Sequence, residues 1–230
     1  LDFQTAFFES GNDLPYILFL PTYAAIAWYH KQLDASLMAD LQVLLAEVET
    51  FTQGEYTAAL FQGSRLSPED RAAIAGKVAR YTGLSPAYVE QANLRIEIQR
   101  FVKELLRHQR RTVGRLDGRF LGIDRDAAGE QYEYDPSYAN IQGPYTAGFN
   151  DYVRRHLQFE SDLAYEILTD RVHPWSYETH QNQYVNVAET LRKAMSINPF
   201  LKVFVANGYY DLATPFTATQ YTFNHLELDP

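Results

Sequence analysis

A short apolar segment, Leu-Lys-Val-Phe-Val-Ala at residues 201–206, constrains the fold of this chain more than any other feature. Its branched and aromatic residues are typical of a buried β-strand. The segment is followed by Asn207-Gly208, by Asp211 and by Pro215, which can start a helix. A helix, a strand and a second helix in succession predict an α/β arrangement. We therefore expect Asp211 to lie in a rigid loop at the carboxyl end of a strand, where the functional groups of parallel sheets collect.

The chain before this segment is predicted to be helical. From Thr22 to about Asn93, apolar side chains recur three and four residues apart, as they do at Leu37, Leu41, Leu44, Leu45 and Val48.

Two helix starts and one helix end are marked by specific residues. Ser67-Pro68 and Ser85-Pro86 each place a capping side chain before a proline at the first helical position. Gly83 is expected to end the first of these helices, because glycine adopts the left-handed backbone at helix ends.

Beyond residue 93 the pattern is more varied. We expect a helix at about 96–107 and a hairpin or tight turn at Asp117-Gly118. Residues 124–148 are rich in Gly, Asp, Pro and Tyr and predict a long ordered loop, and helices are expected at 149–158 and 185–195.

The composition argues against several classes of protein. A hydrophobic content of 46% is enough for a packed core, whereas a net charge of -9 disfavours nucleic acid, because phosphate contacts need clustered cations. Without cysteine the chain has no disulfide, no thiolate nucleophile and no cysteine-based zinc site. The longest uncharged run, from Leu14 to Tyr29, is short for a bilayer span and contains two prolines, so we expect no membrane segment.

Two segments resemble the serine carboxypeptidases. Residues 207–215, Asn-Gly-Tyr-Tyr-Asp-Leu-Ala-Thr-Pro, are similar to the Gly-Asp-x-Asp-x-x-x-Pro segment of that family. Residues 21–30, Pro-Thr-Tyr-Ala-Ala-Ile-Ala-Trp-Tyr-His, resemble a segment of its bacterial members. By this resemblance Asp211 matches the acid that orients the triad histidine, while Tyr209 replaces the first Asp of the family segment.

The resemblance also implies a fold and an activity. The chain would be an α/β-hydrolase fragment, with a mostly α-helical cap and the small part of the parallel-sheet core that carries the triad Asp. Residues 1–13 would enter from the core, 14–184 would form the cap, and 185–230 would return to the core. The implied substrate is the C-terminal peptide bond of a peptide, the implied location is outside the cytoplasm, and no metal or other cofactor is expected.

The chain lacks a recognisable triad serine. On this fold the nucleophile lies in a Gly-x-Ser-x-Gly elbow between a strand and a helix. Ser64 follows a glycine and Ser10 precedes one, but neither has the second glycine or a preceding apolar strand. Both serines are better interpreted as loop residues.

The triad histidine is also missing from the expected position. His225 is the only histidine after Asp211, and it lies near the far end of the next helix, roughly 15 Å from its start. We therefore expect the nucleophile before Leu1 and the catalytic histidine after Pro230, so that the isolated chain is inactive. An unpaired core strand would also favour homodimerisation or domain swapping.

Other groupings suggest weaker candidates. His173, Glu178 and His180 could be imagined as a metal site, but Pro174-Trp175 makes the helix that would align them improbable. The acid pairs Glu160 with Asp162 and Glu47 with Glu49 diverge on a helix and do not support glycosidase chemistry.

Four tyrosines are candidates for a substrate pocket, since aromatic rings provide contact area at low entropic cost. They are Tyr209 and Tyr210 beside Asp211, and Tyr138 and Tyr145 in the aromatic stretch that follows residue 130. Two other functions remain open: a non-catalytic helical interaction domain, and another α/β hydrolase such as an esterase or aminopeptidase.

Overall fold

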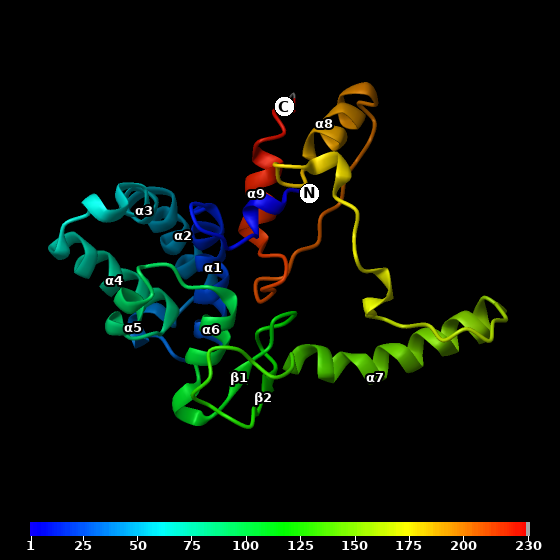
Figure 1. The fold of residues 1–230 in the computed structure, drawn as a ribbon, viewed down its shortest axis with the longest axis horizontal. Coiled ribbons are helices and arrows are strands. Elements are labelled where there is room, and N and C mark those ends of the chain that lie inside the picture. The colour runs from blue at the N-terminus through cyan, green and yellow to red at the C-terminus, as the bar shows by residue number, and fades with distance from the viewer. Residues whose placement is uncertain (229–230) are drawn as a thin grey trace.

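Helix α1 (Leu14–Tyr29) is the centre of the fold in the computed structural model, which describes residues 1–228 (Figure 1). Every residue from Leu18 to Ala27 is buried, and the helix is apolar on all sides. A helix of this kind is stable in water only when other elements surround it. In the described part of the chain, no helix combines the length and the apolar character needed to cross a bilayer.

Shorter helices pack around α1. A π-helical turn, Thr52–Tyr56, joins the first two of them. Helices α2 and α4 contact α1 directly, as does the C-terminal helix α9. These elements are α2 (Leu41–Phe51), α3 (Thr57–Gln62), α4 (Pro68–Thr82), α5 (Pro86–Gln91), α6 (Ile98–Glu104) and α9 (Phe216–Asn224).

Side-chain caps fix the starts of three of these helices. The Asp40 carboxylate accepts from the backbone N–H groups of Gln42 and Val43 at the start of α2. The Ser67 hydroxyl accepts from Asp70 at the start of α4, and Ser85 caps α5 in the same way. Gly83 ends α4 with φ of 72°, so the predicted helix starts and helix end are confirmed.

A small hairpin follows α6. Strands β1 (Thr112–Val113) and β2 (Leu121–Gly122) pair antiparallel, with Thr112 opposite Gly122. The predicted Asp117-Gly118 turn lies between them and is confirmed.

The expected α/β-hydrolase fragment is wrong. The chain is 54% helical, and the two-stranded antiparallel hairpin is the only sheet in residues 1–228, so a parallel core is absent there. Residues 201–206, predicted as the core strand, have no regular secondary structure and pair with no strand in the described chain, and Phe204 is 92% exposed. Apolar sequence alone does not make a strand, because its backbone groups need a neighbouring strand as partner.

The long loop expected at 124–148 is also wrong in its second half. Residues 136–151 form helix α7 (Pro136–Asp151), which begins where the Asp135 carboxylate accepts from the Ser137 N–H at 2.9 Å. This Asp-Pro start was hidden among the turn-forming residues around it. The helix predicted at 149–158 is present as the end of α7 and a π-helical turn, Tyr152–His156, and its start was placed too late.

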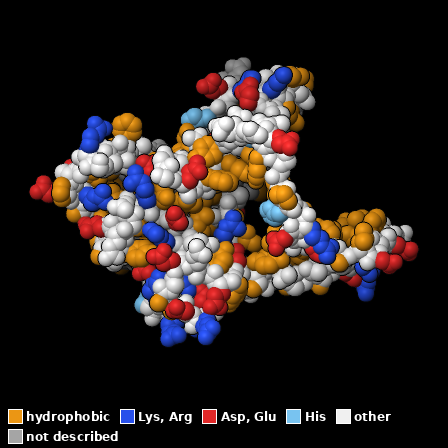
Figure 2. Space-filling model, in the orientation of Figure 1, with side chains coloured by type: hydrophobic (Ala, Val, Ile, Leu, Met, Phe, Trp, Pro, Cys, Tyr) orange, Lys and Arg blue, Asp and Glu red, His pale blue; other side chains and the backbone are white. Residues whose placement is uncertain are grey.

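Residues 136–209 form a projecting arm that leaves and rejoins the helical core (Figure 1). The arm contains α7 and α8 (Ala188–Ile197), which lies close to the helix predicted at 185–195. Its returning part is tied to the N-terminus, because Phe3 N–H donates to Val185 and Val187 N–H donates to Leu1. Many apolar side chains of the arm face solvent (Figure 2).

A buried ion pair connects α6 to the segment after the hairpin. The Lys103 ammonium donates to the Asp124 carboxylate at 2.5 Å and to the Asp126 carbonyl at 2.9 Å, and both charged side chains are 2% exposed. The Thr112 hydroxyl donates to the same carboxylate oxygen at 2.8 Å. Burial opposes ionisation of Asp124, but the bonds from Lys103 and Thr112 outweigh it and lower the pKa of the carboxyl.

We expect Lys103→Met to destabilise the chain by about 3–5 kcal/mol, because it leaves the Asp124 charge buried and unpaired. Urea denaturation measures this loss. The matched control is Lys77→Met, which breaks an exposed pair with Glu55 and should cost less than about 1 kcal/mol. Equal losses in the two variants would contradict the role of the buried pair.

Candidate site around Asp211

Asp211 lies in a tight turn before α9. Its Oδ1 accepts from the backbone N–H groups of Ala213 at 2.7 Å and Thr214 at 3.1 Å. Its Oδ2 accepts from the Thr214 hydroxyl at 2.6 Å. These bonds use three of about four lone-pair positions on the carboxylate. The half-buried group is therefore fixed in orientation and keeps capacity for one further donor.

The residues on both sides of Asp211 are tied to the hairpin turn. The Gly118 N–H donates to the Tyr210 carbonyl at 2.8 Å, and the Leu212 N–H donates to the Arg115 carbonyl at 2.9 Å. The Leu212 side chain is fully buried. Asp211 is thus held between two backbone hydrogen bonds to a loop that is distant in sequence.

The hairpin turn itself is held against α1. The His30 Nε2 atom lies 2.7 Å from the Gly118 carbonyl, and since a carbonyl only accepts, this nitrogen carries the proton. A side chain at Gly118 would place Cβ 2.4 Å from Cδ1 of Ile26, so only glycine permits this approach. The Asp135 carboxylate accepts from Arg115 N–H at 3.0 Å and fixes the other side of the turn.

Tyr209 and Tyr210 lie beside the Asp211 turn. The Tyr209 ring meets Phe216 edge to face at 5.0 Å. The Tyr210 ring contacts Tyr29 at 5.6 Å and lies 5.0 Å from the Arg119 guanidinium. Desolvation raises the pKa of the Tyr210 hydroxyl, against the opposing effect of Arg119. Tyr210 thus packs onto α1 as well as flanking the carboxylate.

Tyr138 and Tyr145 lie on α7, which runs away from the helical core (Figure 1). The Tyr145 side chain is 66% exposed, and Tyr138 is half-buried. In the described residues neither ring contacts Tyr209 or Tyr210. Their assignment to a substrate pocket stays a prediction.

The histidines do not contact the Asp211 carboxylate in the described part of the chain. His225 follows α9, and its Nδ1 lies 2.7 Å from the Tyr221 carbonyl. His173 is exposed, and in the short 3-10 helix Glu178–His180 the Glu178 side chain is exposed and His180 is half-buried. Within residues 1–228, no group of three or more His, Cys, Asp and Glu residues could hold a metal ion.

A cavity of about 320 Å³ adjoins the Asp211 turn. Ala213 and Thr214, whose N–H groups hold Asp211, line it together with Arg115. Its remaining lining is mostly apolar and includes Phe3, Phe7, Phe19, Ile98, Pro215 and Ala218. Asp2 also lines the cavity. In the part of the chain that the structure describes, the Arg115 guanidinium has no ion-pair partner, so the cavity combines this cation with one carboxylate and mostly apolar walls.

Sequence reasoning missed His30 and Arg115. His30 closes the resembling segment on α1, but no local pattern indicates that its ring reaches the turn at Gly118. The Asp117-Gly118 pair predicted the turn, but it did not indicate which distant residues contact that turn. No family model, curated protein or solved structure matches this chain.

We expect the stability of the chain to fall as the pH is lowered through about 6.5, the ordinary pKa of histidine, toward the lower folded-state pKa of His30. Burial lowers this pKa more than the bond to Gly118 raises it, so the unfolded state takes up the proton first. In His30→Gln, whose amide can still donate to Gly118, this part of the pH dependence should disappear.

Thermal melts between pH 8 and pH 5 measure this loss of stability. Its expected size is on the order of 1 kcal/mol for each pH unit by which the pKa of His30 differs between the folded and unfolded states. The control is His108→Gln, an exposed site that should keep the pH dependence of the parent. If His30→Gln and the parent lose stability in parallel, His30 is not buried as a neutral donor.

Proposed function

We propose that this chain is a segment of a serine carboxypeptidase and supplies the acid of its Ser-Asp-His triad, Asp211. The observation that carries the proposal is the fixing of the Asp211 carboxylate by three hydrogen bonds in a turn tied to the core. An acid that orients a histidine needs this rigidity and a free acceptor position. Both requirements are met at Asp211.

The packing of the two resembling segments gives further support. Residues 21–30 and 207–215 are far apart in sequence, yet the helices that carry and follow them are in contact. The Thr217 hydroxyl donates to the Leu18 carbonyl, and the Tyr29 and Tyr210 rings meet at 5.6 Å.

The cavity beside Asp211 fits the proposed substrate. A peptide C-terminus carries a carboxylate and a side chain, and the cavity offers the unpaired Arg115 within mostly apolar walls that also include Asp2. Arginine matches carboxylate geometry with two parallel donors. We therefore place a peptide with an apolar C-terminal residue in this cavity.

The proposed chemistry divides the triad between this chain and residues outside it. A serine attacks the carbonyl of the last peptide bond, and a histidine takes the serine proton and passes it to the leaving amine. Asp211 accepts from the histidine Nδ1–H, holds the productive tautomer and stabilises the imidazolium. The scheme needs no metal or other cofactor.

In the full-length protein, Asp211→Asn should lower kcat for a blocked dipeptide by roughly 10⁴-fold with little change in KM. The asparagine carbonyl still accepts from Ala213 and Thr214, so the turn is retained, but the amide presents the wrong polarity to the histidine. The matched control is Asp162→Asn on the exposed arm, which should leave kcat unchanged.

An unchanged kcat in a folded Asp211→Asn variant would remove Asp211 from the triad. The proposal also requires a Gly-x-Ser-x-Gly elbow and a triad histidine in the complete reading frame. A reading frame that encodes neither contradicts the peptidase function directly.

The projecting arm favours a second function, a non-catalytic helical interaction domain. Apolar side chains on the arm are widely exposed, including Tyr145, Leu163 and Trp175 (Figure 2). Exposed apolar surface of this extent is typical of a site that contacts another protein or another domain. A folded, inactive full-length protein that binds another protein through the arm would favour this function over the peptidase.

A further inference from the structure

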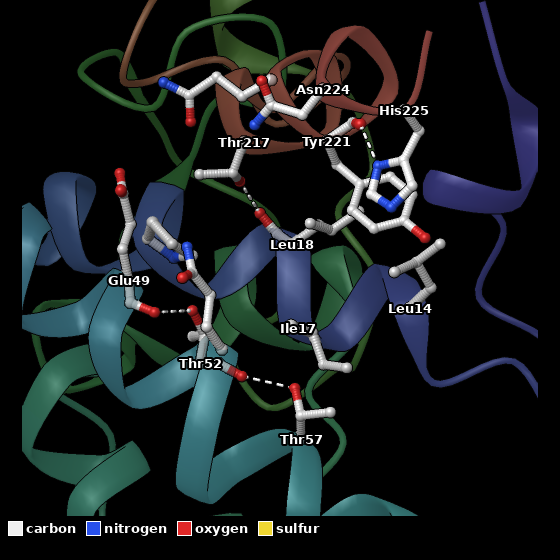
Figure 3. Close-up of a pocket in the computed structure, with 13 residues that line it drawn as sticks. Leu14, Ile17, Leu18, Glu49, Thr52, Thr57, Thr217, Tyr221, Asn224 and His225 are labelled. Carbon is white, nitrogen blue, oxygen red and sulfur yellow. Dashed lines mark hydrogen bonds between the residues drawn. The ribbon is translucent and has the colours of Figure 1, made fainter. Parts of the chain in front are cut away.

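A second and larger cavity lies between α1, α9 and the π-helical turn Thr52–Tyr56. Its volume is about 510 Å³, within the range of small-molecule sites. Figure 3 shows Ile17 and Leu18 of α1 between a wall with Glu49 and Thr52 and an opposite wall with Tyr221 and Asn224. The cavity thus has an apolar floor and polar sides.

The two faces of α9 line different cavities. Thr217, Gln220, Tyr221 and Asn224 recur at spacings of three and four and line the larger cavity. Ala218 and Thr222 line the cavity beside Asp211. A ligand in the larger cavity therefore contacts a face of α9 that takes no part in the Asp211 turn.

An irregular backbone shapes one wall. The chain widens into a π-helical turn where α2 passes into α3, and Thr52 and Gln53 of this turn line the cavity. The Thr52 carbonyl accepts from the Thr57 hydroxyl at 2.5 Å, and the Thr52 hydroxyl donates to the Glu49 carbonyl at 3.0 Å (Figure 3). Single π turns inside helical segments are frequent at functional sites.

The charge of the lining selects a cation. Glu49 is its only carboxylate, and the residues that line the cavity include no Lys or Arg. In the described residues the Glu49 carboxylate has no ion-pair partner, and its partial burial raises the pKa of the carboxyl. A ligand cation would favour the charged form of Glu49 and offset the cost of its partial burial, whereas an anion would meet no Lys or Arg in the lining.

The other polar groups can all accept hydrogen bonds. His225 Nδ1 points to the Tyr221 carbonyl and so carries the ring proton, which leaves Nε2 as an acceptor. The side-chain amides of Gln53, Gln220 and Asn224 are not engaged with other described residues. An ammonium group has three donors and no acceptor, and it matches this set of acceptors.

We propose that this cavity binds a primary alkylammonium group, with the ammonium at Glu49 and the side-chain amides and the alkyl chain on Leu14, Ile17 and Leu18. The alkylammonium comes either from a free organic amine or from the lysine side chain of a peptide. The site does not depend on the peptidase role of Asp211.

The test is a titration of the ¹⁵N-labelled chain with n-pentylammonium, followed by NMR. The side-chain NH₂ signals of Gln53, Gln220 and Asn224 report directly from the cavity walls. Saturable shifts of these signals are expected, with weaker binding of 1-pentanol and none of pentanoate. Pentanoate that binds as tightly as pentylammonium overturns the proposal.

Glu49→Gln should weaken pentylammonium binding about tenfold, because it removes a charged acceptor. The matched control is Glu90→Gln on α5, an exposed acid outside the cavity, which should bind like the parent. Unchanged affinity in Glu49→Gln overturns the proposal. Asn224→Trp, at an exposed position, should block the cavity and abolish binding even if Glu49→Gln does not fold.

A second titration distinguishes the two sources. Tighter binding of Nα-acetyl-lysine methylamide than of pentylammonium assigns a lysine side chain of a peptide. Tighter binding of pentylammonium assigns a free amine. Failure of both to bind removes the site.

Discussion

The burial of α1 from Leu18 to Ala27 is the constraint on which the rest of this structure depends. A helix that is apolar on every side must be covered by other elements, and here it is covered by α2 and α4 on one part and by α9 on another. The helices that pack on α1 are not contiguous in sequence, because α9 lies near the opposite end of the chain. Burial of α1 therefore brings the C-terminal turn with Asp211 to the N-terminal half of the molecule.

The position of Asp211 follows from this arrangement through a short chain of contacts. His30, at the end of α1, reaches the hairpin turn at Gly118, and that turn binds the backbone on both sides of Asp211. The carboxylate is thus held by the core and not by the projecting arm. The arm contributes exposed apolar surface, and its returning part is joined to the N-terminal residues at Val185 and Val187.

Local signals in the sequence predicted local structure well. Ser67-Pro68, Ser85-Pro86 and Gly83 act within one helical turn, and each does what the side-chain chemistry requires. The helix after Pro215 also appears as α9. These predictions succeed because every group involved is close in sequence.

Predictions that needed distant partners failed or could not be made. Residues 201–206 have the composition of a core strand, but a strand needs a neighbour to satisfy its backbone, and no described segment pairs with them. At Asp211, the residue and its rigid loop could be predicted from the sequence, but the contact of Arg115 with Leu212 could not. The cavity around Glu49 was invisible for the same reason, since its walls come from three separate helical segments.

The proposed orientation of a triad histidine by Asp211 is tested most directly by ¹H NMR of the imidazole N–H protons in the full-length protein. A histidine Nδ1–H bonded to a carboxylate gives a low-field resonance that is separate from the amide envelope. We expect this resonance in the parent protein and expect it to be lost or shifted strongly upfield in Asp211→Asn, with Asp162→Asn unaffected. A low-field resonance that persists unchanged in a folded Asp211→Asn variant would show that another acid holds the histidine and would contradict the proposed role of Asp211.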